Sequence, residues 1–269
     1  MKISNKIKIP KNLSNNEIIN YFKKWKILNY FKSYRFEKNT KELNTLVFSS
    51  SPYSPELKDL YRLHSFLILN KRLTVLEFGS GWSSLVMAHA LKINKLKHSL
   101  KTKALRKSNK FEIHSIENEK KYLNISKRRL YKFLGAKNKS FFHFSNCKMT
   151  VYNGKICSEY NKLPLVNPDF IYLDGPDQKK ILGNIKGITI NHSDMLPILC
   201  DILKIEYFLI PGTIIVTDGR TANALFLKNN FQRNWIYYFD RKNDQNLFYL
   251  NDDSLGPVNE FQRKFYKKV

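Results

Sequence analysis

Short apolar segments alternate with amphipathic segments along most of the chain after residue 72. The apolar segments carry little charge and are rich in β-branched and aromatic residues, which is typical of buried β-strands. They occupy residues 73–79, 111–117, 140–144, 169–175 and 212–219. The helical candidates between them are residues 83–91, 120–135 and 193–204. This alternation indicates a doubly wound α/β fold, in which helices cover both faces of a parallel sheet.

The end of the chain departs from this alternation. Residues 234–240 and 246–252 are two further strand candidates, separated by the short polar segment RKNDQ. A link this short predicts a hairpin, so these two strands are expected to be antiparallel.

The first 54 residues form a basic and aromatic segment that precedes the α/β domain, which we expect to span residues 55–269. Apolar residues near helical spacing over residues 18–32 predict a short helix. They are Ile18, Ile19, Phe22, Trp25, Ile27 and Leu28. This helix could pack on the main domain, or the lysines around it could direct it to a membrane surface or a partner. Residues 49–56 then break the chain, and Pro55 with Ser54 as N-cap predicts the start of a helix that runs to about Asn70.

Composition limits the class of protein. Of 269 residues, 42% are hydrophobic and 14% aromatic, which excludes global disorder. No apolar stretch approaches the roughly 18 residues of a transmembrane helix, and the N-terminus has no apolar signal region. The three cysteines form no CxxC pair, which disfavours a disulfide scaffold or a zinc module. We therefore expect a cytoplasmic protein.

The charge is strongly positive, with 47 Lys+Arg against 22 Asp+Glu, a net +25. It could indicate a polyanionic partner, or simply a lysine-, asparagine- and isoleucine-rich composition. Residues 92–110 carry eight Lys/Arg and no acid, and separate the first helix of the α/β region from its second strand. We expect this segment to be a solvated insertion that folding does not need, with a docking surface for an acidic substrate or nucleic acid as the alternative.

The turn after the first strand is the strongest chemical signal. Residues 77–84 read EFGSGWSS, so Gly79 and Gly81 let the chain bend between strand and helix and approach a ligand closely. Ser84 stands where the dinucleotide-binding pattern has its third glycine, which argues against NAD or FAD. No GK[ST] follows, so the turn is not a phosphate-binding loop of that type.

Carboxylates end the following strands. Glu117 ends the second strand, where a carboxylate can accept hydrogen bonds from both hydroxyls of a ribose. Asp174 ends the fourth strand in the motif DGPD, and Asp218 ends the fifth strand, which a Pro211-Gly212 turn introduces. Asp174 and Asp218 could share Mg²⁺, or Asp174 alone could be functional while Asp218 caps a turn.

These signals in this order resemble the class I S-adenosylmethionine-dependent methyltransferases, over about residues 73–252. The resemblance implies a Rossmann-like seven-stranded sheet, mostly parallel, with a reversed last strand. It implies that Glu77, Gly79, Ser80 and Gly81 surround the methionine portion of the cofactor and that Glu117 holds the ribose. It further implies that Asn146 or Cys147 lies beside the adenine and that Asp174 lies near the sulfonium and the acceptor.

Within that family, the Asp-Gly pairs after the fourth and fifth strands are similar to those of small-molecule and sugar O-methyltransferases, some of which use a metal. The catechol-type enzymes have an Asn after the second Asp, whereas this chain has Gly219 and then Arg220. Candidates for the base are Asp174, His192, Asp218 and Lys179, the last lying near the place of a family lysine but at another spacing. The [DNS]-P-P-[YF] signature of nucleic-acid amino-methyltransferases is absent.

The sequence therefore favours S-adenosylmethionine-dependent O-methylation of a small molecule or sugar. Two alternatives stay open: an RNA or protein methyltransferase that uses the basic segment 92–110, and a non-catalytic binding module with the same fold.

Overall fold

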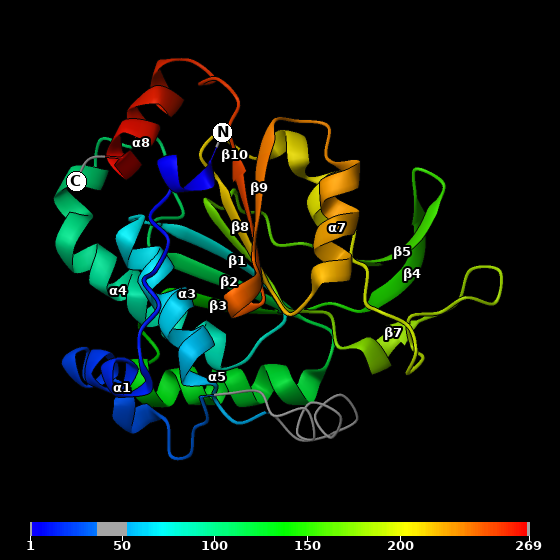
Figure 1. The fold of residues 1–269 in the computed structure, drawn as a ribbon, viewed down its shortest axis with the longest axis horizontal. Coiled ribbons are helices and arrows are strands. Elements are labelled where there is room, and N and C mark those ends of the chain that lie inside the picture. Colours follow the sequence, from blue (N-terminus) through cyan, green and yellow to red (C-terminus); the bar gives the residue numbers. More distant parts are fainter. Residues whose placement is uncertain (1, 37–52, 268–269) are drawn as a thin grey trace.

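The computed structural model describes residues 2–36 and 53–267, and its centre is a seven-stranded sheet (Figure 1). In spatial order the strands are β3 (Ser140–Phe144), β2 (Glu112–Glu117), β1 (Thr74–Phe78), β6 (Phe170–Leu173), β8 (Ile214–Asp218), β10 (Gln245–Leu250) and β9 (Trp235–Asp240). Neighbouring strands are parallel except that β10 is antiparallel to both β8 and β9. The predicted doubly wound sheet, its terminal hairpin and the reversed strand are therefore confirmed.

Two layers of helices and loops cover this sheet because each strand has apolar side chains on both faces. On the first face Val75 packs with α3 (Leu57–Leu69), α4 (Trp82–Thr102) and α5 (Lys120–Leu134). On the second face Leu76 packs with α6 (Asp201–Lys204), α7 (Thr221–Asn230) and a smaller sheet. The last helix, α8 (Pro257–Lys267), lies near the amino ends of the strands. The short 3₁₀ helices are η1 (Ile3–Asn5), η2 (Leu28–Tyr30), η3 (Gln178–Lys180), η4 (Glu206–Phe208) and η5 (Arg241–Asn243).

The N-terminal helix α1 (Asn15–Lys24) packs against α3, which agrees with one of the two expectations, but it ends at Lys24 and so covers only the first part of the predicted 18–32. Ile18 and Phe22 are buried in the same core as the strands, and Ser14 and Glu17 form a capping box at the start of the helix. The division of the chain at residues 54 and 55 stays a prediction, and part of the predicted break at 49–56 lies outside the described residues. The predicted start of α3 is wrong, because α3 begins at Leu57 with Glu56 as its N-cap.

The predicted insertion at 92–110 is instead largely a continuation of α4, which runs to Thr102. Asn94 explains the continuation, because its buried amide donates hydrogen bonds of 2.9 Å to the backbone carbonyls of Leu67 and Arg72. Beyond the helix, Leu105 is buried as well. The segment is therefore not a separate insertion, although most of its side chains are exposed as expected, and whether folding needs it stays a prediction.

The helix predicted at 193–204 is also wrong over most of its length, since only Asp201–Lys204 is helical. Other groups use the backbone carbonyls that a helix would need. The Gln178 amide donates to the carbonyl of Met195, and the backbone N–H of Ser158 donates to the carbonyl of Ile198. Pro197 removes a further donor from this segment.

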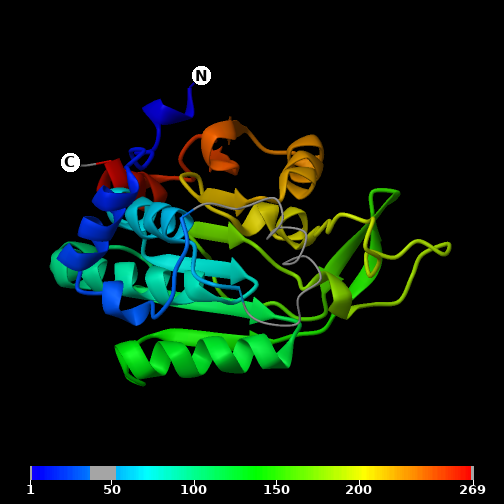
Figure 2. The same cartoon turned by 60° about the horizontal axis from the view of Figure 1, so that its bottom comes forward.

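A three-stranded sheet that the apolar pattern did not reveal lies beyond the carboxyl ends of the central strands (Figure 2). Its strands are β5 (Lys155–Tyr160), β4 (Cys147–Tyr152) and β7 (Ile181–Leu182). Asn153 and Gly154 join β4 to β5 with positive φ at both residues, the preferred chemistry of a two-residue hairpin. Of the helices in the described residues, none is long and apolar enough to cross a membrane.

Candidate active site

Two glycine-containing turns meet at the carboxyl edge of the sheet. The backbone N–H of Asp174 donates to the carbonyl of Phe78 at 2.9 Å, and Gly79 adopts a φ of +97°. A Cβ on Gly175 would lie 2.5 Å from the backbone nitrogen of Gly79, closer than real Cβ contacts allow. Glycine at 79 and 175 therefore lets the turns after β1 and β6 touch backbone to backbone.

Glu77 lies beneath the first of these turns and is fully buried. Its carboxylate accepts hydrogen bonds from Ser83 at 2.5 Å, Ser84 at 2.6 Å and Ser115 at 2.5 Å. Burial raises the pKa of Glu77 to about 7, although the three hydroxyl groups oppose the shift. These bonds tie the end of β1 to the start of α4 and to β2, and so hold the turn that contains Ser80 and Gly81.

Glu117 stands at the end of β2, 3% exposed, beside the same turn. One carboxylate oxygen accepts the backbone N–H groups of Asn118 at 2.9 Å and Glu119 at 3.0 Å, and the other accepts the Ser80 hydroxyl at 3.2 Å. Burial raises the pKa of Glu117 to about 7. Asn118 in turn exchanges two hydrogen bonds with the backbone of Asp177, which fastens the end of β2 to the loop after β6.

Asp174 and Asp218 follow residues that are paired across β6 and β8, Leu173 and Thr217, so the expected adjacency of the two strand ends is confirmed. Asp174 is ion-paired with Arg220, whose guanidinium also donates to the backbone carbonyl of Asp174. Arg220 is the residue that sequence reasoning noted only as a departure from the catechol-type pattern.

Mg²⁺ does not fit these side chains. A guanidinium lies against one of the two candidate ligands, where a second cation would be repelled. In residues 2–36 and 53–267, no group of three or more His, Cys, Asp or Glu side chains could hold a metal ion. Mg²⁺ is commonly bound through one or two carboxylates and several waters, and here one of the two candidate carboxylates is already paired with arginine.

The remaining predicted residues lie in different surroundings. Lys179 and His192 are both exposed, and their segments are joined because the Gln178 amide donates to the His192 carbonyl at 2.6 Å. Asn146 is exposed at the start of the smaller sheet, whereas Cys147 is buried within it, and burial raises the pKa of its thiol to about 12. All three cysteines are buried free thiols.

Two aromatic residues lie near this edge, and one of them, Tyr53, had no signal in the sequence. Trp82, which begins α4, packs between the Arg129 guanidinium, 3.6 Å from its ring centroid, and the edge of Phe31. Tyr53 is half exposed, and burial and the neighbouring carboxylates Asp174 and Asp177 raise its pKa. The ring contact of Trp82 with Phe31 and the charge effect of Asp174 on Tyr53 show that the N-terminal segment lies near the carboxyl edge.

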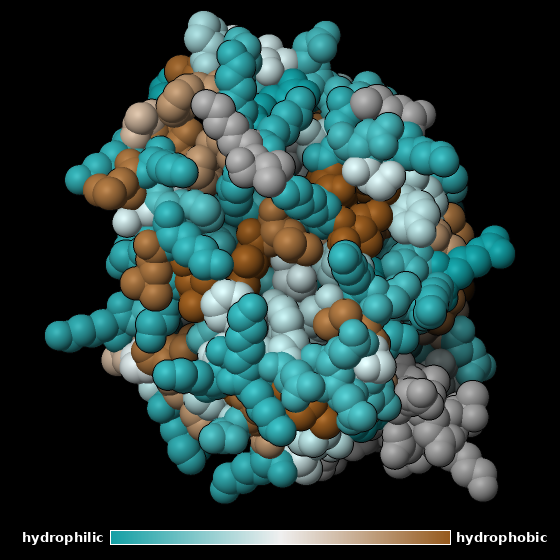
Figure 3. Space-filling view, turned by 60° about the vertical axis from the view of Figure 1, so that its left-hand side comes forward, coloured by the Kyte–Doolittle hydropathy of each residue, from teal (hydrophilic) through white to brown (hydrophobic). Residues whose placement is uncertain are grey.

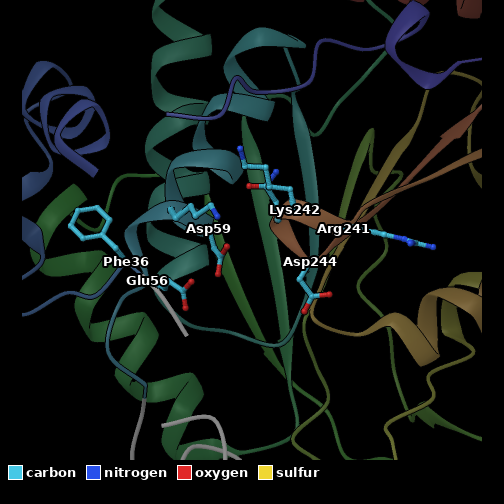
Figure 4. Close-up of a pocket in the computed structure, with 8 residues that line it drawn as sticks. Phe36, Glu56, Asp59, Arg241, Lys242 and Asp244 are labelled. Carbon is cyan, nitrogen blue, oxygen red and sulfur yellow. The ribbon is translucent and has the colours of Figure 1, made fainter. Parts of the chain in front are cut away.

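A cavity of about 340 Å³ opens beside the same edge (Figure 4). Its lining residues are Phe36, Glu56, Lys58, Asp59, Arg241, Lys242, Asn243 and Asp244. In Figure 4, Asp59 of α3 and Asp244 of the loop between β9 and β10 face a common space, whereas Arg241 points away from it. The Gly219 N–H donates to the Asp244 carbonyl at 2.9 Å, so the cavity adjoins the end of β8.

Several solved structures with a similar chain path are named as methyltransferases. An O-methyltransferase from Bacillus cereus in complex with SAH is 12% identical, with 93% of this chain and 95% of that chain covered and a TM-score of 0.38. A putative caffeoyl-CoA O-methyltransferase from Staphylococcus aureus is 12% identical over 88% and 98% of the chains, with a TM-score of 0.43. The tRNA (m1A58) methyltransferase TrmI from Aquifex aeolicus is 14% identical over 79% and 76%, with a TM-score of 0.40.

No family model matches the sequence, and no curated protein sequence matches it. The identities and TM-scores of these structural matches are low, so they say nothing about the activity of this chain.

Proposed function

We propose that this protein is an S-adenosylmethionine-dependent methyltransferase that acts on a hydroxyl group of a small molecule or sugar. The observation that carries the proposal is the pairing of Glu117 with Ser80. A buried carboxylate at the end of β2 contacts the glycine turn at the end of β1, in a sheet whose penultimate position holds a reversed strand. This arrangement suits a nucleoside with a charged amino-acid tail.

The residues at this edge fit such a cofactor. Glu117 can accept hydrogen bonds from ribose hydroxyls, at the oxygen that now accepts only Ser80 among the described side chains. Space is open beside Gly81, where a Cβ would meet nothing closer than 3.6 Å. When bound, the cofactor would supply an electrophilic methyl group on its sulfonium, and Asp174 would lie toward that reactive end.

For methyl transfer, the protein must align the acceptor with the methyl group and remove one proton from the acceptor. The acceptor oxygen must approach the methyl carbon in line with the bond that breaks, and its proton must pass to a base. Asp174, His192 and Lys179 are the candidates for that base. Arg220 would balance the charge of Asp174 and leave the reaction without need of Mg²⁺.

The cavity beside β8 is the proposed acceptor site. Its volume of about 340 Å³ suits a small molecule, and its mixture of carboxylates, basic groups and one aromatic ring suits a polyhydroxylated one. The carboxylates of Glu56, Asp59 and Asp244 are matched by Lys58, Arg241 and Lys242, so the lining has no excess of positive charge for a nucleic-acid backbone. This balance favours a small molecule or sugar over RNA.

A transfer assay with methyl-labelled S-adenosylmethionine tests the proposal, with sugar nucleotides, glycan fragments and tRNA as acceptors. Label on a sugar or small molecule, lost in an Asp174→Ala variant that still binds S-adenosylhomocysteine, is the expected result. Label on tRNA alone would support the RNA alternative. Cofactor binding without transfer to any acceptor would support a binding module.

A further inference from the structure

A second surface with an unusual composition lies at the opposite end of the sheet from the candidate active site. The helix α8 crosses the amino ends of the strands, where its Tyr266 hydroxyl donates to Asp169 at 2.6 Å. The Phe265 ring contacts the edge of His98, so α8 lies beside the second half of α4. Figure 1 shows both helices together with the N-terminus on the left-hand side of the molecule.

Large apolar side chains are exposed on this side. Leu96 and Leu100 are one turn apart on α4 and are 74% and 76% exposed. Val258 and Phe261 are one turn apart on α8 and are each about half exposed, and Leu255 precedes them. Figure 3 shows this side of the molecule, with apolar patches set among hydrophilic side chains.

Cations surround these apolar residues. The exposed basic residues of the α4 end and the following turn are Lys92, Lys95, Lys97, Lys101, Lys103 and Arg106. No acid occurs between residues 92 and 110. On α8, Glu260 is paired with Lys264. We call Leu96, Leu100 and these cations together the basic–apolar face.

The positive charges of this side repel one another. Burial, followed by the charges of Lys8 and Lys101, lowers the pKa of Lys71. Burial and then the charges of Lys267 and Arg263 lower the pKa of Lys6 near the N-terminus. Elsewhere on the surface a lysine such as Lys139 is paired with a carboxylate, that of Glu112. The face is therefore complementary to a negatively charged surface.

We propose that the basic–apolar face docks on the surface of an anionic lipid bilayer. The leucine side chains would enter the boundary between headgroups and acyl chains, while the surrounding lysines would contact lipid phosphates. A nucleic acid accounts for the lysines but not for Leu96 and Leu100, and phosphate recognition in folded grooves favours arginine. Docking by this face leaves the carboxyl edge, at the other end of the strands, open to its substrates. The proposal does not depend on methyl transfer.

Sedimentation of the full chain with vesicles tests the proposal. The protein should sediment with vesicles of phosphatidylcholine and phosphatidylglycerol and remain in solution with phosphatidylcholine alone. The triple variant Lys95→Glu, Lys101→Glu, Lys103→Glu should lose binding by about two orders of magnitude, since each lysine near such a surface contributes roughly fivefold. Its control, Lys162→Glu, Lys186→Glu, Lys228→Glu, changes net charge equally from exposed positions elsewhere and should keep most of the binding.

A second pair of variants tests the apolar part. Leu96→Ser with Leu100→Ser should weaken binding at least tenfold, whereas Leu165→Ser with Leu196→Ser, at positions 102% and 64% exposed elsewhere, should not. Each variant is first checked for the thermal unfolding transition of the parent protein. The proposal is overturned if the folded protein does not bind anionic vesicles or if the Leu96→Ser, Leu100→Ser variant binds as the parent does. It is also overturned if a variant and its matched control lose binding equally. Binding of tRNA without binding of vesicles would overturn it in favour of a nucleic acid.

Discussion

Arg220 lies against Asp174, with its Nε 3.6 Å from a carboxylate oxygen. The two residues are far apart in the sequence and meet because β6 and β8 are neighbours whose carboxyl ends coincide. A fixed positive charge thus lies where the paired aspartates would otherwise attract a metal ion. The ion pair therefore affects whether a metal ion can bind, how readily Asp174 can accept a proton, and the charge that faces the cofactor.

Metal binding should therefore be weak. Electron paramagnetic resonance of Mn²⁺ mixed with the protein and S-adenosylhomocysteine should show only free Mn²⁺ at micromolar concentrations. Once an acceptor is known, EDTA should leave turnover unchanged. Arg220→Ala should lower kcat/KM about 10- to 100-fold through the loss of charge-assisted hydrogen bonds, with Arg220→Lys in between. Tightly bound Mn²⁺, or turnover that EDTA stops and Mg²⁺ restores, would contradict this view of Arg220.

The contact between the two glycine turns predicts that alanine substitutions at two glycines will differ clearly in their effect on the free energy of unfolding. Gly175→Ala should lower the free energy of unfolding by about 1–3 kcal/mol, because its Cβ would lie 2.5 Å from backbone atoms of Gly79 that cannot yield. Gly81→Ala has open space and an extended backbone, so its unfolding free energy should change by less than about 0.5 kcal/mol. Urea denaturation measures both, and equal losses would show that the turns are not in close contact.

The continuation of α4 predicts that the basic segment takes part in folding. Asn94→Ala removes a buried amide that satisfies two backbone carbonyls, so it should cost about 1–3 kcal/mol of unfolding free energy. Asn124→Ala, on the exposed side of α5, is the matched control and should cost little. A stable protein after deletion of residues 92–110 would restore the idea of a dispensable insertion.

The shifted pKa of Glu117 predicts how cofactor affinity depends on pH. Ribose hydroxyls donate to the ionised carboxylate, and a pKa of about 7 means that a proton must leave before binding at lower pH. Affinity for S-adenosylhomocysteine should therefore fall as pH decreases below about 7, by roughly tenfold per unit at most. Comparison with Glu117→Gln isolates this residue from Glu77, which titrates in the same range. A parent protein with the same pH dependence as Glu117→Gln would refute the assignment.

Much of this architecture is readable from the sequence because it depends on local pattern. The apolar strands, the glycine turn and the terminal hairpin can each be recognised from a few consecutive residues. The β4–β5 hairpin had a local signal, Asn153-Gly154, that the strand pattern around it did not make clear. The segment 193–204 has helical spacing, yet Pro197 and the long-range partners of its carbonyls keep it irregular.

Only part of the candidate site could likewise be predicted from the sequence. Glu117, Ser80 and the glycines belong to motifs, so the sequence identified them together. The pairing of Arg220 with Asp174, the proximity of Tyr53 and the cavity beside β8 depend on segments that only the folded chain brings together. The spacing of residues within one strand or helix cannot predict contacts between segments that are far apart in the sequence.

Isothermal titration calorimetry with S-adenosylhomocysteine tests the central claim most directly. The parent protein should bind it and should not bind NAD. Glu117→Ala should weaken binding by about 2–4 kcal/mol, or roughly 30- to 1000-fold, through the loss of two charge-assisted hydrogen bonds to the ribose. Glu260→Ala, an exposed carboxylate on α8, is the control and should bind as the parent does. Tight binding of NAD with none of S-adenosylhomocysteine, or an unchanged dissociation constant in folded Glu117→Ala, would contradict the account.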